Sequence, residues 1–284
     1  MDIDIKNLSF RYPGVDVFHD VTMDMGRPEL YGILGPNGVG KSTLIHCINR
    51  ILQPAGGTVM IDGEDVDKYR LKDLAKKLGY VPCAGSDAFP MTVVDTILVG
   101  RHPHSDWRVT KQDYDLVYDT ISTMGLSDLA MRPFNELSAG QKQKVMLARG
   151  LVQQPSAILL DEPTANLDIK HQYGVTKMLR RITRERNMLA VMVCHDLNIA
   201  SRYCDRIILM SEGTVYKMGT PQEVITESNI RHVYGVDCKV IHNYGCPHVI
   251  VFDDGLDEIS EVVPESACDV DTISDVNEKS IAHP

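Results

Sequence analysis

A short glycine-rich segment near the N-terminus restricts the possible folds of this chain more than any other feature. It fits the pattern GxxxxGK[ST] and reads Gly35-Pro36-Asn37-Gly38-Val39-Gly40-Lys41-Ser42, with Thr43 following. An apolar stretch precedes it, and residues 41–52 after it have the pattern of a helix. In such a setting the glycines let backbone N–H groups turn towards phosphate oxygens, and the helix N-terminus adds its positive dipole end. The segment therefore predicts a phosphate-binding loop between a strand and a helix.

Two acidic residues supply the rest of a nucleotide site. Asp161 and Glu162 end the apolar stretch Ala157 to Leu160. Alone they would be a weak signal, because strand ends often carry solvated charge. Together with the loop they predict hydrolysis of ATP with Mg²⁺. Lys41 would contact the β- and γ-phosphates, Ser42 would ligate Mg²⁺, Asp161 would hold the metal through water, and Glu162 would polarise the attacking water.

Strand and helix patterns alternate through most of the chain. Strand patterns occur near residues 2–8, 17–25, 30–34, 59–62, 157–161, 189–194 and 206–210. Helical patterns dominate from about Phe89 to Leu151, and a hairpin is expected over residues 239–252. Strands alternating with helices predict an α/β fold with a mostly parallel sheet.

The net charge of −10 is concentrated in the last 32 residues. Residues 253–284 hold ten acidic side chains and one lysine, which leaves 28 basic and 29 acidic residues in positions 1–252. The acid-rich tail predicts a flexible segment. A nearly neutral body offers no basic field for nucleic acid, so none is expected as a partner. No apolar run reaches the length of a membrane span, and seven cysteines without a CxxC pair favour reduced thiols in the cytosol.

Four further segments resemble the motifs of the ATP-binding-cassette (ABC) ATPases. Leu137-Ser138-Ala139-Gly140-Gln141 is similar to the LSGGQ signature, and residues 161–168, DEPTANLD, resemble the Walker B motif and D-loop. His195, before Asp196-Leu197, resembles the switch histidine, and Tyr12 lies where the family carries the aromatic residue that stacks on adenine. The resemblance covers about residues 3–220.

This resemblance implies a fold and an assembly. It implies a P-loop NTPase, with a RecA-like core, an N-terminal antiparallel β portion and an inserted helical subdomain at about residues 88–152 of an ATPase domain spanning 1–252. It also implies a head-to-tail homodimer that encloses two ATP molecules. Ser138, Gly140 and Gln141 would face the nucleotide of the other subunit, Asp168 would cross between subunits, and His195 would contact the γ-phosphate.

One position departs from the family pattern. Leu78-Gly79-Tyr80-Val81-Pro82 leads in the family into the glutamine of the Q-loop, whereas this chain has Cys83. An amide oxygen suits Mg²⁺ better than a soft thiol does, and water can replace the missing ligand. We therefore expect ATP binding to survive and hydrolysis, or its coupling to a partner, to be weaker. The alternative is that Cys83 is a harmless small hydrophobic residue.

Residues 90–95, 98–104 and 224–236 resemble importers of chelated iron, cobalamin and haem. Membership of that branch implies an integral-membrane permease, an extracellular substrate-binding protein, and a place on the cytoplasmic face of the membrane through the permease. Residues at about 83–104, including Phe89 and Met91, would form a groove for a helix of the permease, although Val93, Val94 and Leu98 are expected simply to pack the subdomain. The alternatives are a soluble cassette ATPase acting on nucleic acid or ribosomes, and a weakly active regulatory cassette.

Two other groups of residues allow more than one interpretation. Cys238, His242, Cys246 and His248 could suggest zinc, but strand alternation explains them without metal. The arginines at positions 180, 181, 184 and 186 are typical of a solvated helix face, with nucleic-acid binding as the less favoured alternative.

Overall fold

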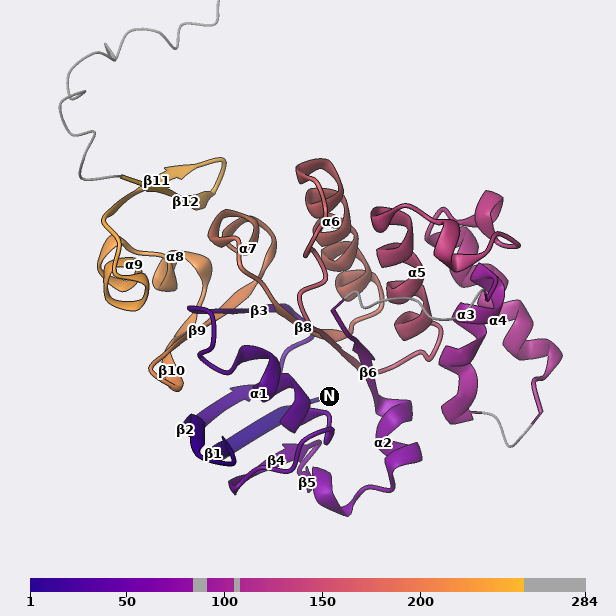
Figure 1. Ribbon diagram of the computed structural model, residues 1–284, viewed down its shortest axis with the longest axis horizontal. Coiled ribbons are helices and arrows are strands. Elements are labelled where there is room, and N and C mark those ends of the chain that lie inside the picture. Colours follow the sequence, from indigo (N-terminus) through magenta and orange to yellow (C-terminus); the bar gives the residue numbers. More distant parts are fainter. Residues whose placement is uncertain (84–90, 105–107, 253–284) are drawn as a thin grey trace, which may run out of the picture. The chain divides into compact units, whose positions relative to one another are not determined.

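The computed structural model describes residues 1–83, 91–104 and 108–252 (Figure 1). Contacts divide the chain into two units, Met1–Val251 and Phe252–Pro284. The acidic tail and Phe89 lie outside the described residues, so the predictions made for them stay predictions. All the helices and strands that the structure describes belong to the first unit.

A six-stranded sheet forms the centre of this unit. Its order is β10-β9-β3-β8-β7-β6, and β10 pairs antiparallel with β9 whereas the other pairs are parallel. The strands are β3 (Leu30–Leu34), β6 (Leu78–Val81), β7 (Ala157–Leu160), β8 (Leu189–Val193), β9 (Arg206–Ser211) and β10 (Thr214–Gly219). This confirms the predicted α/β fold with a mostly parallel sheet. The patterns did not predict β6 or β10 as strands.

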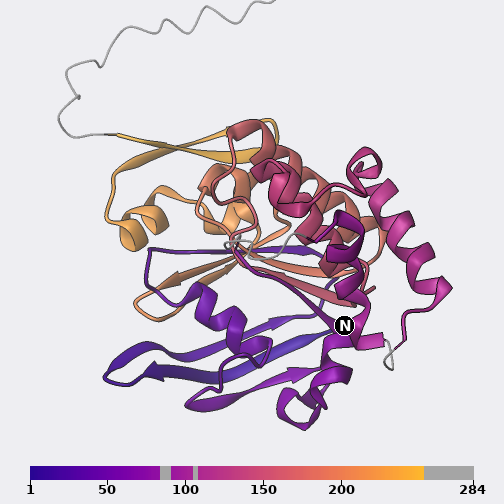
Figure 2. The same ribbon diagram turned by 45° about the vertical axis from the view of Figure 1, so that its right-hand side comes forward.

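The sheet is buried on both faces, which explains why its strands are continuous apolar runs. Alternate residues along β7 and β8 point into two different hydrophobic cores, one on each face of the sheet. Ile158 and Met192 join the core with α5 (Ala139–Leu151), α6 (Ile169–Glu185) and α7 (Leu197–Tyr203). Leu159 and Val191 join the core with α1 (Lys41–Ile48). Figures 1 and 2 show these two groups of helices on opposite sides of the sheet.

A second, antiparallel sheet packs against α1. Its order is β2-β1-β4-β5, with β1 at Ile3–Tyr12, β2 at Val15–Met25, β4 at Gly56–Ile61 and β5 at Glu64–Asp65. Helix α1 ends at Ile48, earlier than the pattern up to Leu52 predicted. The chain leaves the helix there because Arg50 takes a left-handed φ of 57°. A short 3-10 turn, η1 (Val66–Lys68), and α2 (Leu71–Lys77) then lead to β6.

Short helices fill the region between β6 and β7. They are α3 (Val93–Leu98), η2 (Val99–His104), α4 (Lys111–Thr123), η3 (Ser127–Leu129), η4 (Phe134–Glu136) and α5. Val93 and Val94 are buried in the same core as α5, as expected of residues that pack this region, and Leu98 is half-buried against it.

The C-terminal part of the unit packs against α7. It consists of α8 (Pro221–Val224), α9 (Glu227–Tyr234) and the hairpin of β11 (Cys238–Asn243) and β12 (Cys246–Val251). Asn198 of α7 bonds both backbone groups of Val249, at 2.8 and 3.2 Å. Across the described ranges, the structure has no helix with both the length and the apolarity that crossing a bilayer needs.

Candidate active site

The glycine-rich loop joins the carboxyl end of β3 to α1, as the sequence predicted. Two of its glycines are sterically required. Gly40 has a φ of +100°, and a Cβ there would lie 2.9 Å from Val17 and 3.0 Å from Phe18. A Cβ on Gly35 would lie 2.5 Å from the carbonyl oxygen of Met210. The loop therefore keeps its backbone close to neighbouring strands, which leaves a cradle of the kind that phosphate groups occupy.

Lys41, the first residue of α1, points back over this loop. Its Nζ donates to the carbonyl oxygens of Gly35, at 2.9 Å, and Pro36, at 2.8 Å. The side chain is buried, and burial lowers its pKa, while the nearby carboxylates of Glu162 and Asp161 oppose that shift. A buried ammonium group at the mouth of the cradle is well suited to an anionic ligand.

Ser42 and Asp161 meet although they are 119 positions apart in the chain. The Ser42 hydroxyl donates to Oδ1 of Asp161 at 2.7 Å, because β3 and β7 end at the same edge of the sheet. A hydroxyl and a carboxylate are hard oxygen ligands of the type that Mg²⁺ takes. The pair therefore fits the predicted metal.

Glu162 and His195 form a second pair at this edge. Nε2 of His195 lies 2.6 Å from Oε1 of Glu162, and both side chains remain partly exposed. Glu162 follows β7 with a left-handed φ of 49°, and His195 follows β8, the neighbouring strand. The histidine and the carboxylate thus contact each other directly at the open side of the phosphate loop.

The structure adds two residues that sequence reasoning missed. Nε2 of His46 lies 2.8 Å from the Tyr80 hydroxyl and 3.7 Å from Oδ2 of Asp161. Burial, with the charges of Asp161 and Cys83, raises the pKa of Tyr80 to about 12. The i,i+4 spacing of Ser42 and His46 could have indicated that both lie on one face of α1.

Cys83, at the Q-loop position, follows β6 and is half-buried.

The LSAGQ segment begins helix α5. Ser138 is its N-cap, with the Ser138 N–H donating to Oε1 of Gln141 at 3.0 Å and the Gln141 N–H donating to the Ser138 hydroxyl at 3.4 Å. This capping box leaves a helix start with its dipole exposed at the surface.

Asp168 is the N-cap of helix α6, and its partner His171 lies beside Gly140 of the LSAGQ segment. Its Oδ1 accepts from the backbone N–H of His171 at 2.8 Å and lies 2.7 Å from Nδ1 of the same residue. These bonds hold the pKa of Asp168 below its usual value. The ring of His171 lies so close to Gly140 that a Cβ there would be 2.5 Å from Cδ2. No sequence signal singled out His171.

Tyr12 ends β1, and nearly half of its side chain is exposed. Its ring and that of Phe10 make an edge-to-face contact, with centroids 4.9 Å apart, so the ring is supported from within the sheet. It comes from the antiparallel sheet rather than from the edge that carries the carboxylates.

Of the cysteines and histidines of the C-terminal hairpin, Cys246 and His248 contact each other, with Sγ 3.4 Å from Nε2, and the strand register separates the other two. Cys238 pairs with Val251, His242 with Pro247 and Cys246 with Asn243 in the register of β11 and β12. Within the parts of the chain that the structure describes, no three His, Cys, Asp or Glu side chains are arranged to hold a metal ion.

Comparison with known proteins identifies the family. Residues 18–165 match the family described as ABC transporter. An uncharacterized ABC transporter ATP-binding protein of Methanocaldococcus jannaschii is 42% identical over 250 residues, covering 88% of this chain and 98% of the relative. The chain belongs to the ABC transporter ATP-binding family. It is therefore an ATPase, and its fold is that of a P-loop NTPase.

Other ABC proteins match over most of the chain. The cobalamin import ATP-binding protein BtuD of Halobacterium salinarum is 35% identical, over 82% of this chain and 59% of the relative. The ferric enterobactin transport ATP-binding protein FepC of Escherichia coli is 34% identical, over 86% of this chain and 92% of the relative.

Solved ABC structures share the fold. One, assigned to a metal-chelate type ABC transporter in an inward-facing conformation, has a TM-score of 0.78 at 26% identity, over 89% of this chain and 98% of the other. An ATP-binding cassette solved as a dimer in a post-hydrolysis state, bound to ADP and Pi, has a TM-score of 0.68 at 27% identity, over 77% of this chain and 98% of the other.

Proposed function

We propose that this chain is the ATP-hydrolysing subunit of a membrane ABC importer for an iron chelate, cobalamin or a related metal complex. The observation that carries the hydrolytic part is the meeting of Lys41, Ser42, Asp161, Glu162 and His195 at one edge of the sheet. The import part rests on relatives named for cobalamin import and ferric enterobactin transport, and it extends their printed roles to this chain.

Each side chain of the site has a role in the proposed reaction. Lys41 binds the β- and γ-phosphates in the cradle of residues 35–43, and Tyr12 stacks on the adenine. Ser42, and Asp161 through water, would hold Mg²⁺, which would neutralise phosphate charge. Glu162 accepts a proton from the attacking water, and His195 orients that carboxylate and contacts the γ-phosphate.

The proposed active unit is a homodimer. The exposed start of α5, with Ser138, Gly140 and Gln141, would face the γ-phosphate held by a second copy, where a helix dipole favours negative charge. Asp168 would contact the partner, and its bonding to His171 beside Gly140 would link the two segments. A related cassette solved as a dimer with ADP and Pi supports this arrangement.

The proposed permease contact lies on the helical subdomain, about residues 88–152 of an ATPase domain spanning 1–252. A cavity of about 500 Å³ there is lined by Met91, Leu98, Val99 and Val109 together with charged residues of η2 and α4. An apolar cavity beside exposed Met91 suits a helix of the permease. The chain would then act on the cytoplasmic face of the membrane, and the permease and an extracellular substrate-binding protein would select the cargo.

Glu162→Gln tests the hydrolytic role. We expect ATP binding to persist, turnover to fall by about a hundredfold or more, and an ATP-bound dimer to accumulate. Glu185→Gln, at the exposed end of α6, is the matched control and should leave turnover unchanged. Normal turnover in the Glu162 variant, or a variant that stays monomeric with ATP, would contradict the proposal. Negligible turnover in the wild type would favour the regulatory-cassette alternative.

A further inference from the structure

A basic pocket lies at the edge of the main sheet opposite the phosphate loop. Glu29 precedes β3, Asp205 precedes β9 and Arg206 begins it, whereas the phosphate loop follows the carboxyl end of β3. Lys177 and Arg180 come from the second half of α6, and Arg202 and Tyr203 from the last turn of α7. The cavity measures about 660 Å³, within the range of about 300–1,000 Å³ that small-molecule sites occupy.

The pocket holds more positive charge than its own carboxylates neutralise. Four cations, Lys177, Arg180, Arg202 and Arg206, line it with the carboxylates of Glu29 and Asp205, which leaves a net charge of +2. Composition does not explain this clustering, since positions 1–252 hold one more acid than base.

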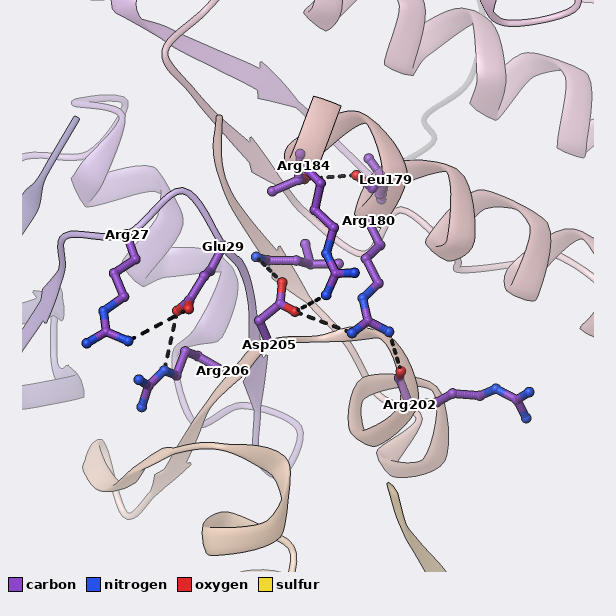
Figure 3. Close-up of polar contacts among 10 residues, drawn as sticks. Arg27, Glu29, Leu179, Arg180, Arg184, Arg202, Asp205 and Arg206 are labelled. Carbon is purple, nitrogen blue, oxygen red and sulfur yellow. Dashed lines mark hydrogen bonds and ion pairs between the residues drawn. The ribbon is translucent and has the colours of Figure 1, made fainter. Parts of the chain in front are cut away.

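Both carboxylates already have several cationic partners (Figure 3). Oδ1 of Asp205 accepts from Arg180 at 3.4 Å and from Arg184 at 3.0 Å, and its Oδ2 accepts from the backbone N–H of Leu30 at 3.1 Å. Glu29 lies 3.3 Å from Nε of Arg206 and 4.0 Å from Arg27. Neither acid is therefore available to a further cation.

The remaining cations lack acidic partners. In the described part of the chain, no carboxylate pairs with Lys177 or Arg202, and the Arg202 guanidinium lies over the Tyr203 ring, 5.9 Å from its centroid. Nε of Arg180 is buried without a hydrogen-bond acceptor among those residues, although the same guanidinium donates to the carbonyl oxygen of Arg202 at 3.1 Å. Because this Nε has no exposed surface, a ligand would be bound by the exposed groups of Lys177 and Arg202.

We propose that this pocket binds a small molecule through a phosphate group. A phosphomonoester carries a charge of about −1.5 to −2 at neutral pH, which matches the lining, and guanidinium groups bind phosphate through paired hydrogen bonds. The cavity exceeds the size of one phosphate and has Tyr203 and Tyr244 on its walls, so an organic portion fits beside the phosphate. The concave shape favours a small ligand over a nucleic acid or a membrane surface.

Calorimetric titration of the full chain tests this site. All proteins carry Lys41→Ala to remove phosphate binding at the loop, and the probes are inorganic phosphate and glucose 6-phosphate. We expect Lys177→Gln with Arg202→Gln to weaken binding about tenfold or more. The matched control, Arg70→Gln with Arg181→Gln, removes the same charge outside the pocket, because Arg70 is exposed near α2 and Arg181 pairs with Glu185.

The two probes separate the sources of the phosphate group. Tighter binding of glucose 6-phosphate assigns the pocket to an organic phosphate, and equal binding assigns it to the free ion. Lys177→Glu alone gives a second test, because it reverses one charge of the pocket at an exposed position and should also weaken the binding of both probes. The proposal is overturned if neither probe binds, or if both double variants bind equally well. It is also overturned if the pocket variant instead abolishes binding to single-stranded oligonucleotides or anionic vesicles that phosphate does not displace.

Discussion

The buried ion pair between Arg101 and Asp113 allows a quantitative test of how the helical region is held together. Nε of Arg101, in η2, donates to Oδ1 of Asp113, in α4, at 2.9 Å. Nη1 of Arg101 donates to the carbonyl oxygen of Val152, at the end of α5, at 3.0 Å. Oδ2 of Asp113 accepts from the backbone and hydroxyl of Thr110, the N-cap of α4. Replacing Asp113 by Asn would remove the charge and keep the side-chain size.

The expected loss of folding stability follows from the lowered pKa of Asp113. Bonds from Thr110, then from Arg101, lower that pKa from 3.8 to about 2. Such a fall corresponds to roughly 2.5 kcal/mol of stability at neutral pH, and truncating one partner of a buried pair costs about 3–5 kcal/mol. We therefore expect Asp113→Asn to lower the free energy of unfolding by about 2–4 kcal/mol.

The pH dependence has a definite sign. Because the folded pKa lies below the unfolded one, the contribution of Asp113 is complete above pH 3.8 and is lost as the pH falls towards 2. The difference in stability between wild type and Asp113→Asn should therefore shrink below about pH 4.

Urea unfolding at several pH values would measure both effects. Asp115→Asn, exposed on the same helix, is the control and should change stability by less than about 0.5 kcal/mol. Arg101→Met should cost about as much as Asp113→Asn, and the double variant less than the sum of the two. The reasoning is refuted if Asp113→Asn behaves like Asp115→Asn, or if the two single effects simply add.

Three further changes test the site. Gly40→Ala should weaken ATP binding about tenfold, measured with a fluorescent nucleotide, because its Cβ would lie 2.9 Å from Val17. Gly38→Ala shares the strain of a positive φ, at +81°, but has open space around its Cβ, so it should cost less, and equal effects would contradict this. Cys83→Gln should raise Mg²⁺-dependent turnover several-fold, and unchanged turnover and transport would show that the thiol is harmless. Ser138→Ala removes an N-cap worth about 1 kcal/mol. It should lower turnover and leave ATP binding to the isolated chain intact, and weaker ATP binding to the isolated chain would contradict this.

The parts of the site that depend on short sequence motifs could be predicted without the structure. The phosphate loop and the acids at the end of β7 each involve residues close together in the chain, so local geometry follows from residue type and spacing. The alternation of apolar strands and helices likewise indicated the mostly parallel sheet.

Tertiary structure alone decided which distant segments meet. The pairing of β3 with both β8 and β9 brings residues near position 30 beside residues near 190 and 206, and no local pattern encodes such contacts. The basic pocket around Asp205 depends on the pairing of β3 with β9, and the contact of His46 with Tyr80 depends on the place of β6 beside β7 in the same sheet. Amino acid sequence thus determined the chemistry that each segment carries, and long-range strand pairing determined which of these side chains act together.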